Sequence, residues 1–164
     1  MDRLVKALRW LIPLLEARGG RYQISGGFAA HLYGGRRPVN DIDVDVPRDV
    51  LDQLVPLVAD YTTYGPGPYS DSTWDIPYLV GLKYGDQEID LTAADGARIS
   101  NKSTCGWDPL VMRLDAVERV EYGGLTLRVQ NREDLIAYKS KIKYGEHNHL
   151  ADIEDIRRAA SGGA

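Results

Sequence analysis

Apolar and polar residues alternate along this chain with two different periods. Leucines recur every three or four positions from Leu4 to Leu15, and this spacing predicts an amphipathic helix over residues 2–18. Pro13 lies inside that helix, where a proline can kink it or end it early. Residues 41–46 instead alternate strictly between aspartate and a β-branched residue, which predicts a strand with one polar face.

Shorter patterns and turn-forming residues predict the other elements. Two hairpins are expected, one turning at Gly85-Asp86 and one at Gly123-Gly124. The segment 62–77 is rich in glycine, proline and aromatic residues, so we expect a long exposed loop there. This order predicts an α/β (α+β) fold, in which helices flank a mixed β-sheet and further helices follow at the C-terminal end. The remaining expected elements are a short strand at 21–25, helical segments at 27–33 and 49–58, and C-terminal helices at 132–145, capped by Asn131, and 149–160.

Length and composition fit one domain. The 164 residues are 43% hydrophobic and 27% charged, which supplies enough apolar side chains for a single core. We expect one domain over 1–164, with a core at about 20–130 and a C-terminal helical part at about 131–160. Residues 4–17 are apolar but interrupted by charges and a proline, so neither a signal peptide nor a membrane span is predicted.

Net charge and cysteine content bear on partners and compartment. The formal charge of −4 argues against a surface built for broad electrostatic binding of nucleic acid, although a local basic patch stays open. The single cysteine, Cys105, excludes an internal disulfide framework and is typical of a protein in a reducing compartment. We therefore expect a cytoplasmic protein that does not act at a membrane.

The row of aspartates is the most unusual feature of the sequence. Side chains two residues apart on a strand share a face and lie roughly 6–7 Å apart, so Asp41, Asp43 and Asp45 would line one face. Ionised carboxylates at this spacing repel one another, and a divalent cation relieves the repulsion. A solvated face that protects a sheet edge is the alternative. A calcium loop of the EF-hand kind is excluded, because Val46 and Asp52 occupy the positions that require glycine and glutamate.

Gly26 and Gly27 lie between the expected strand at 21–25 and the helical segment that follows it. Backbone N–H groups at such a junction, together with the helix dipole, favour a phosphate group. Glycines also let a triphosphate approach the backbone closely. A glycine pair is common at ordinary turns too, so it indicates a nucleotide site only in combination with the aspartate row.

Together these residues resemble the nucleotidyltransferase superfamily that shares its fold with DNA polymerase beta. The family pattern is an apolar residue, Gly-Gly or Gly-Ser, about a dozen residues, and then Asp-x-Asp between apolar positions. Here "ISGG" is followed by thirteen residues and then by Asp41 and Asp43 in "DIDV". The family's third carboxylate lies on a later strand between apolar residues, and Asp90 in "QEIDLTA" fits that position.

Within that superfamily the sequence is most similar to two groups. The small lincosamide and aminoglycoside nucleotidyltransferases of antibiotic resistance carry Arg-Pro-x-x-Asp-x-Asp, as this chain does from Arg37. Toxin-type nucleotidyltransferases of toxin–antitoxin systems carry a lysine-bearing helix followed by Asp-Ile-x-Asp, as here at Lys139, Asp152 and Asp155. The turn departs from the Gly-Ser form that is frequent in the family, so Gly27 offers a phosphate only its backbone.

The resemblance implies a magnesium-dependent transfer of a nucleoside monophosphate to an acceptor hydroxyl, with release of pyrophosphate. It implies Asp41, Asp43 and Asp90 as the catalytic and metal-binding residues for two Mg²⁺ ions. Asp90 would also help to deprotonate the acceptor. The co-substrate would be a nucleoside triphosphate, with ATP expected. The residues implied for nucleotide binding are Gly26, Gly27, Arg37 and Lys139.

Several other residues stay open between a functional and a structural role. Lys139, Lys141 and Lys143 could form a solvated helix face, and Lys139 is the one expected to reach a phosphate. Asp45 is expected to support the site or contact a substrate rather than bind metal. Glu88 could bind a basic acceptor or simply face solvent.

Histidine and aromatic residues are similarly open. His147 and His149 form a His-x-His pair, but no third ligand stands at a fixed spacing, so a metal site there is not expected. Tyr64, Tyr69 and Trp74 could stack on a base or on an acceptor, or they could cover the core.

The expected partners are a nucleoside triphosphate and an acceptor, which is either a small molecule or a large one such as tRNA or a protein. The chain leaves little room for a separate acceptor domain, which suggests an acceptor site built in a homodimer or a large acceptor. The rival interpretation is a non-catalytic nucleotide-binding module or toxin–antitoxin component that keeps the fold. The set of Asp41, Asp43 and Asp90 favours the enzyme, because a module that only binds needs no third carboxylate.

Overall fold

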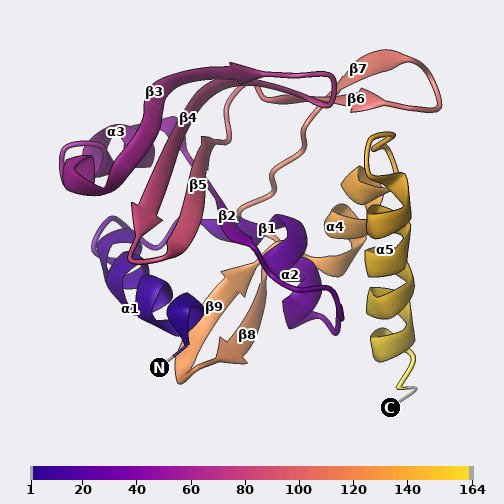
Figure 1. Cartoon of the computed structure of the whole chain (residues 1–164), viewed down its shortest axis with the longest axis horizontal. Coiled ribbons are helices and arrows are strands. Elements are labelled where there is room, and N and C mark those ends of the chain that lie inside the picture. Colours follow the sequence, from indigo (N-terminus) through magenta and orange to yellow (C-terminus); the bar gives the residue numbers. More distant parts are fainter. Residues whose placement is uncertain (1, 163–164) are drawn as a thin grey trace.

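The computed structural model describes residues 2–162, and within them nine strands form one mixed sheet with helices packed on it (Figure 1). The helices are α1 (Arg3–Glu16), α2 (Gly26–Leu32), α3 (Arg48–Leu54), α4 (Arg132–Lys139) and α5 (Glu146–Ala160), with a 3-10 turn at Ala59–Tyr61. The strands are β1 (Gln23–Ser25), β2 (Asp41–Val46), β3 (Thr62–Ser70), β4 (Trp74–Tyr84), β5 (Gln87–Ala93), β6 (Arg98–Asn101), β7 (Gly106–Pro109), β8 (Glu118–Tyr122) and β9 (Leu125–Val129). The expected fold class, a mixed sheet flanked by helices, is confirmed.

The aspartate-rich strand β2 lies in the middle of the sheet. The strand order is β7-β6-β4-β5-β2-β1-β9-β8, and β3 pairs with β4 outside this path. β2 pairs in parallel with β5 and antiparallel with β1. A strand with a partner on both sides has no free edge, so the alternative that its aspartates protect a sheet edge is wrong.

The two faces of β2 differ as the alternation predicts. Ile42, Val44 and Val46 are fully buried in the main hydrophobic core. Helices α1 and α3 both contact β5, the strand beside β2. The core therefore fixes which face of β2 carries the carboxylates, because a shift of one residue would exchange the faces.

The segment 62–77 is not the exposed loop that its composition suggests. Most of it belongs to the antiparallel pair β3 and β4, which shifts register at several points. In the described part of the chain β3 pairs with β4 alone, so its other edge is free. Pro66 and Pro68 lie on β3, and an edge strand tolerates prolines because half of its N–H groups need no partner.

Three smaller differences from the expected elements have local causes. α1 runs through Pro13 to Glu16, because this proline lies on the exposed side, where water can satisfy the carbonyl that loses its partner. α4 ends at Lys139 rather than near residue 145, and Gly145, with a φ of 71°, precedes α5. The hairpin of β6 and β7 was not expected from the sequence pattern.

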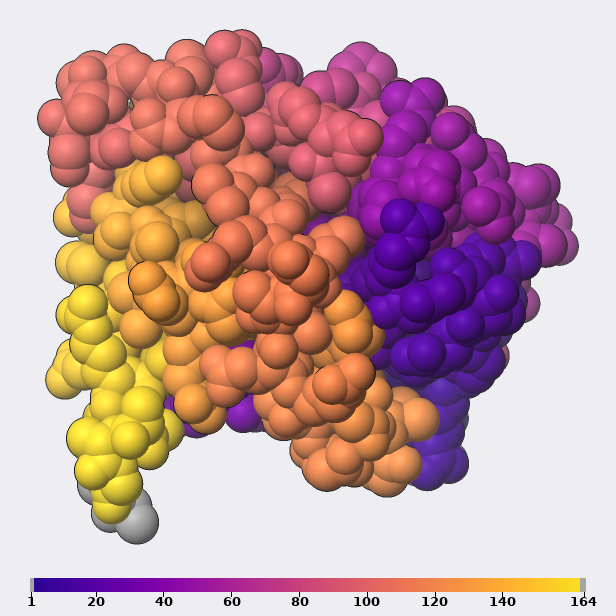
Figure 2. Space-filling view, turned by 180° about the vertical axis from the view of Figure 1, so that it is seen from behind, coloured from indigo at the N-terminus to yellow at the C-terminus, as the bar shows by residue number. Residues whose placement is uncertain are grey.

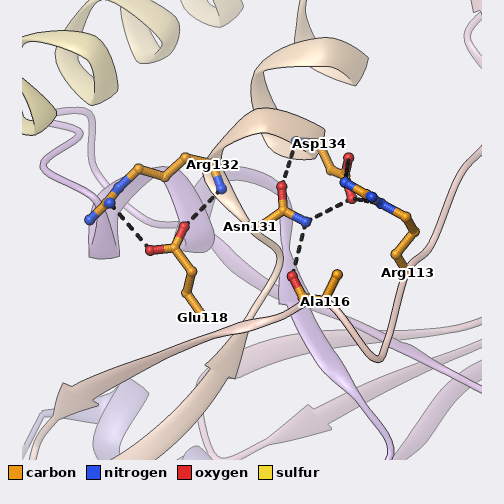
Figure 3. A network of polar contacts seen from close by, with 6 residues as sticks. All are labelled: Arg113, Ala116, Glu118, Asn131, Arg132 and Asp134. Atoms are coloured by element: carbon orange, nitrogen blue, oxygen red, sulfur yellow. Dashed lines mark hydrogen bonds and ion pairs between the residues drawn. The ribbon is translucent and has the colours of Figure 1, made fainter.

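A polar network fixes the start of α4 (Figure 3). The Asn131 side chain accepts a hydrogen bond of 2.9 Å from the backbone of Asp134, as the expected cap, and donates one of 3.0 Å to the Ala116 carbonyl. Arg113 donates two hydrogen bonds of 2.8 Å to the carboxylate of Asp134. These contacts tie α4 to the chain just before β8, and so they help to set where Lys139, the last residue of the helix, lies.

Helix α5 lies along one end of the molecule, where it contacts α2 and α4 (Figure 1). Seen from behind, α5 and α1 lie at opposite sides of the molecule, with the segment that contains β8 and β9 between them (Figure 2). No helix within residues 2–162 combines the length and the apolar character that a membrane crossing demands.

Candidate functional site

Asp43 lies at the centre of a row of residues that crosses one face of the sheet. Its register partner on β1 is Ser25, and its partner on β5 is Asp90. Gly81 on β4 pairs with Asp90 and continues the row. Asp41 shares this face, and oxygen atoms of Asp41, Asp43 and Asp90 all lie within 4.8 Å of one another. The parallel pairing of β2 with β5 thus brings together carboxylates from two distant parts of the sequence.

These three carboxylates repel one another in a partly buried position. No ion pair to Asp41, Asp43 or Asp90 exists within residues 2–162. Burial, followed by the charges of Asp41 and Asp90, raises the pKa of Asp43 well above its usual range. Burial, with the charges of Asp41 and Glu88, raises the pKa of Asp90 to about 6. The cluster is therefore short of positive charge.

The donor set suits a hard divalent cation. Mg²⁺ prefers oxygen ligands and is usually held by one or two carboxylates together with substrate phosphates. Asp41, Asp43 and Asp90 offer oxygens close enough to share ions, and they are the only group of three or more potential ligands found in residues 2–162. The residues present therefore fit the expected magnesium site.

The glycine pair lies directly beside this cluster. Gly26 has a φ of +65°, and a Cβ placed on it would lie 2.1 Å from Oδ2 of Asp43. Only glycine permits both this backbone conformation and this approach. A Cβ on Gly27 would meet nothing within 4 Å, so this position has room for the serine that resembling proteins often carry.

A cavity of about 610 Å³ opens in front of the carboxylates. Its size lies within the usual range of roughly 300–1,000 Å³ for small-molecule sites. Both the core and the C-terminal helical part contribute to its lining. All seven residues expected at the site line it: Gly26, Gly27, Arg37, Asp41, Asp43, Asp90 and Lys139.

Lys139 enters the cavity as a buried cation rather than as part of a solvated face. Its side chain is 2% exposed, and Nζ lies 3.0 Å from Oδ2 of Asp152. Arg37 donates two hydrogen bonds, of 2.8 and 2.7 Å, to the same carboxylate. Burial lowers the pKa of Lys139, and the charge of Asp152 opposes this. Asp152, on α5, thus holds two cations at one side of the cavity.

The second aspartate of α5 binds the loop that leads into β2. Asp155 accepts hydrogen bonds from the backbone N–H and the side chain of Arg36, at 3.0 and 3.1 Å, and pairs with Arg158. These contacts with Arg36 and Arg158 lower the pKa of Asp155 to about 2. Arg36 is therefore a structural contact, whereas its neighbour Arg37 lines the cavity.

Asp45 and Glu88 lie at the margins of the cluster. Asp45 is 6% exposed and accepts a hydrogen bond of 2.8 Å from Nε2 of Gln23. Burial raises the pKa of Asp45 to about 6. Glu88 is exposed and lines the cavity next to Asp41, its register partner. Neither residue belongs to the group of close ligand oxygens.

Most of the other residues considered for a chemical role lie outside the cavity. Lys141 pairs with Asp108 at 3.2 Å, outside the cavity. Of the His-x-His pair only His149 lines the cavity, so the two do not form a joint site there. Cys105 is exposed and does not line the cavity.

Sequence reasoning gave no site role to several residues that the fold brings to the cavity, among them His149, Tyr138 and Gly81. His149 has Nδ1 3.4 Å from Nζ of Lys139, and burial lowers the pKa of His149 to about 4. Its spacing of three residues before Asp152 places both on one helix face, and this was a usable signal. Tyr138 and Gly81 also line the cavity, and no local pattern marks either of them.

Comparison with known proteins gives a structural likeness only. No family model matches the chain, and no curated protein matches its sequence. A candidate nucleotidyltransferase from Thermotoga maritima superposes with a TM-score of 0.64 at 15% identity, over 99% of this chain and 96% of the other. ANT(2'')-Ia, solved with adenylyl-2''-tobramycin, gives 0.59 at 17%, over 99% and 91%. The lincosamide antibiotic adenylyltransferase LnuA, solved with lincomycin, gives 0.57 at 19%, over 92% and 96%.

At these identities the likeness establishes the fold alone. The matched structures include the aminoglycoside and lincosamide enzymes of the two antibiotic-modifying groups that the sequence motifs resemble. The sequence motif of a glycine turn followed by paired aspartates therefore occurs here in the fold that these matched structures share. This chain has the nucleotidyltransferase fold.

Proposed function

We propose that this protein is a magnesium-dependent nucleotidyltransferase, which transfers a nucleoside monophosphate from a nucleoside triphosphate to an acceptor hydroxyl and releases pyrophosphate. One observation carries the proposal: Asp41, Asp43 and Asp90 converge, without a cationic partner in the described residues, at a cavity that also holds a glycine turn. The fold that the chain shares with adenylyltransferases supports the same reaction class.

Asp41, Asp43 and Asp90 would hold the metal. Bound Mg²⁺ supplies charge neutralisation and orients the phosphates of the nucleotide. Without a cation, burial and mutual repulsion make the ionised form of these carboxylates unfavourable. A bound cation would relieve this cost, which favours metal binding.

The glycine turn and the basic side of the cavity would bind the nucleotide. At Gly27 the space that a side chain would take is open, so a phosphate can approach the backbone there, and Gly26 makes room for the carboxylate of Asp43 beside it. Lys139 and Arg37 would add positive charge from the side of the cavity next to α5, where Asp152 holds both in place. Because Lys139 is already oriented and largely desolvated, it needs little reorganisation to contact an anion.

Asp90 would act on the acceptor. As a carboxylate at the cavity it can accept the proton of the acceptor hydroxyl. The acceptor oxygen forms a bond to the α-phosphorus while the bond from that phosphorus to the oxygen bridging to the β-phosphate breaks. The electron pair of the broken bond leaves with pyrophosphate, and the proton of the acceptor hydroxyl passes to Asp90 and then to water.

The test is transfer of label from α-labelled nucleoside triphosphates. Each of the four nucleotides is incubated with Mg²⁺ and with small hydroxyl compounds, tRNA or proteins, and labelled acceptors are identified by mass. Asp43→Asn should abolish transfer. Asp49→Asn is the matched control, because Asp49 is exposed and lies outside the cavity lining.

Two results would contradict the proposal. Full activity in the Asp43→Asn variant would show that the site is elsewhere. Binding of Mg²⁺ and nucleotide without transfer to any acceptor would favour the non-catalytic alternative, a nucleotide-binding module or toxin–antitoxin component.

A further inference from the structure

The cavity continues beyond the carboxylates into a part that the nucleotide proposal does not use. We call it the apolar recess; it is lined by Tyr64, Tyr69, Trp74, Ile76, Leu79 and Met112. The row that crosses the sheet runs from Ser25 through Asp43, Asp90 and Gly81 to Tyr64. Ser25, which the glycine turn follows, and Tyr64 of the recess therefore lie on opposite sides of Asp43 and Asp90 in the sheet.

The wall of the recess belongs to a small apolar cluster separate from the main core. Ile76, Leu79 and Ala97 form this cluster, and Trp74 and Met112 pack against it. Ile76 and Leu79 are only 7% and 8% exposed, so both are packed in the protein while they line the cavity. A ligand that covers this wall with apolar surface would gain a binding free energy of roughly 25 cal/mol for each Å² of apolar surface buried.

Gly81 leaves the narrow space between Tyr64 and Asp90 free of a side chain. Its φ lies outside the left-handed region, so the backbone itself does not require glycine. A Cβ on Gly81 would lie 3.2 Å from Cβ of Tyr64, 3.3 Å from Oγ1 of Thr63 and 3.5 Å from Oδ1 of Asp90. Any larger side chain would fill the space between Asp90 and the aromatic side of the recess.

The charge of the cavity opposes an acceptor that carries phosphate. Among the lining residues, carboxylates outnumber lysine and arginine five to two. A nucleoside triphosphate with two Mg²⁺ ions adds about no net charge, so the loaded cavity stays negative. A neutral or cationic acceptor avoids this repulsion, whereas a nucleic acid or phosphate ester does not.

We propose that the apolar recess is the acceptor subsite, that it takes a compact, neutral or cationic hydroxyl compound with an apolar body, and that Gly81 sets how large a group can reach Asp90. This inference rests on the proposed function and adds the acceptor class to it. The apolar body would lie against Leu79 and Tyr64, and the hydroxyl would pass over Gly81 to Asp90.

The experiment measures transfer of label to matched acceptors. Phenyl β-glucoside, methyl β-glucoside, glucose 6-phosphate and tRNA are compared with the full chain, Mg²⁺ and each nucleotide. We expect kcat/KM for phenyl glucoside to exceed that for methyl glucoside by about tenfold, since a buried ring adds apolar contact. A preference for glucose 6-phosphate or tRNA would overturn the inference and leave the proposed function standing.

Two variants on neighbouring strands test Gly81 itself. Gly81→Val should lower kcat/KM for phenyl glucoside by at least about tenfold while KM for the nucleotide is unchanged. Gly67→Val is the matched control, because a Cβ there would meet nothing within 4 Å and Gly67 does not line the cavity. Equal loss in both variants, or none in Gly81→Val, would overturn the assigned role.

Tyr64→Ala keeps the inference testable if Gly81→Val does not fold. Tyr64 is 44% exposed on the edge strand β3, so its removal should leave the core intact. We expect a higher KM for phenyl glucoside and an unchanged KM for methyl glucoside. The same KM as wild type for both would overturn the recess as the acceptor subsite. Failure to bind Mg²⁺ and nucleotide in the wild-type protein would instead refute the proposed function.

Discussion

Two aspartate motifs in this chain have similar sequences and opposite surroundings. In "DID", residues 41–43, both carboxylates lie on a strand and no ion pair reaches them in the described residues. In "DIED", residues 152–155, both aspartates lie on α5 and every one of their close partners is a cation. The pKa of Asp43 is raised, whereas the pKa values of Asp152 and Asp155 are lowered.

The difference separates a binding role from an anchoring role. The helical pair holds Arg36 and Arg37, on the loop before β2, and also Lys139 from α4. It therefore fixes the position of the strand pair relative to the basic wall of the cavity. The strand pair keeps its charge uncompensated, which costs stability unless a ligand cation is present.

Asp43→Asn should have the largest effect on the strand motif. Removing a central metal ligand should abolish measurable transfer, a loss of about a thousandfold or more. The same change relieves repulsion with Asp41 and Asp90, so the metal-free variant should melt at a temperature equal to or above that of the wild type. Activity assays and thermal denaturation in EDTA measure the two effects. A strongly destabilised variant would mean that Asp43 is a structural residue.

Asp152→Asn should instead affect the stability of the protein most strongly. It leaves Lys139 buried without its ion-pair partner, and breaking such a pair costs roughly 3–5 kcal/mol. We expect a large fall in the free energy of unfolding, measured with urea, together with a raised KM for nucleotide. Lys139→Met with Asp152→Asn removes both charges and should recover much of the stability but not the nucleotide affinity.

Adding Mg²⁺ should stabilise the protein, because the cation relieves the repulsion among the carboxylates of the strand motif. At a hundredfold excess over its Kd, a ligand that binds only the folded state adds about 2.7 kcal/mol. A rise in melting temperature with Mg²⁺, lost on adding EDTA, would confirm the site. The Asp43→Asn variant should lack this rise, and an equal rise there would contradict the assignment.

Alanine substitutions at Gly26 and Gly27 test the close approach of the backbone to Asp43. Gly26→Ala forces a side chain into the Asp43 carboxylate at a positive φ and should reduce activity by at least about tenfold. Gly27→Ala meets open space and should stay within about twofold of wild type. Steady-state kinetics of the two variants test this, and equal losses would contradict the close approach at Gly26.

The smallest effect is expected at Lys141, two residues after Lys139. It pairs with Asp108 at a partly exposed position, and such pairs contribute about 0–1 kcal/mol. Lys141→Ala should therefore leave kcat and KM within about twofold, whereas Lys139→Ala should raise KM for nucleotide strongly. Similar effects of the two changes would remove the contrast between a buried and a solvated lysine.

Alternation with period two was a reliable guide because it depends only on local geometry. It placed Ile42, Val44 and Val46 in the core and the aspartates on the other face, and the structure confirms this. Asn131 was recognised as a cap for the same reason, since its contact lies three residues away. Composition misled at 62–77, because an edge strand tolerates the glycines and prolines that usually mark loops.

The sequence alone determined the strand with its row of carboxylates and the glycine turn before it, since each depends on residues that are neighbours in the chain. The order of the expected elements along the chain also indicated the type of fold. Tertiary structure decided the rest. The register of β2 against β5 brought Asp90 beside Asp43, and the packing of α5 joined Arg37 and Lys139 to one carboxylate. The recess beside Gly81 likewise exists only when β3 and β4 pair, because contacts between distant segments are set by packing and not by local spacing.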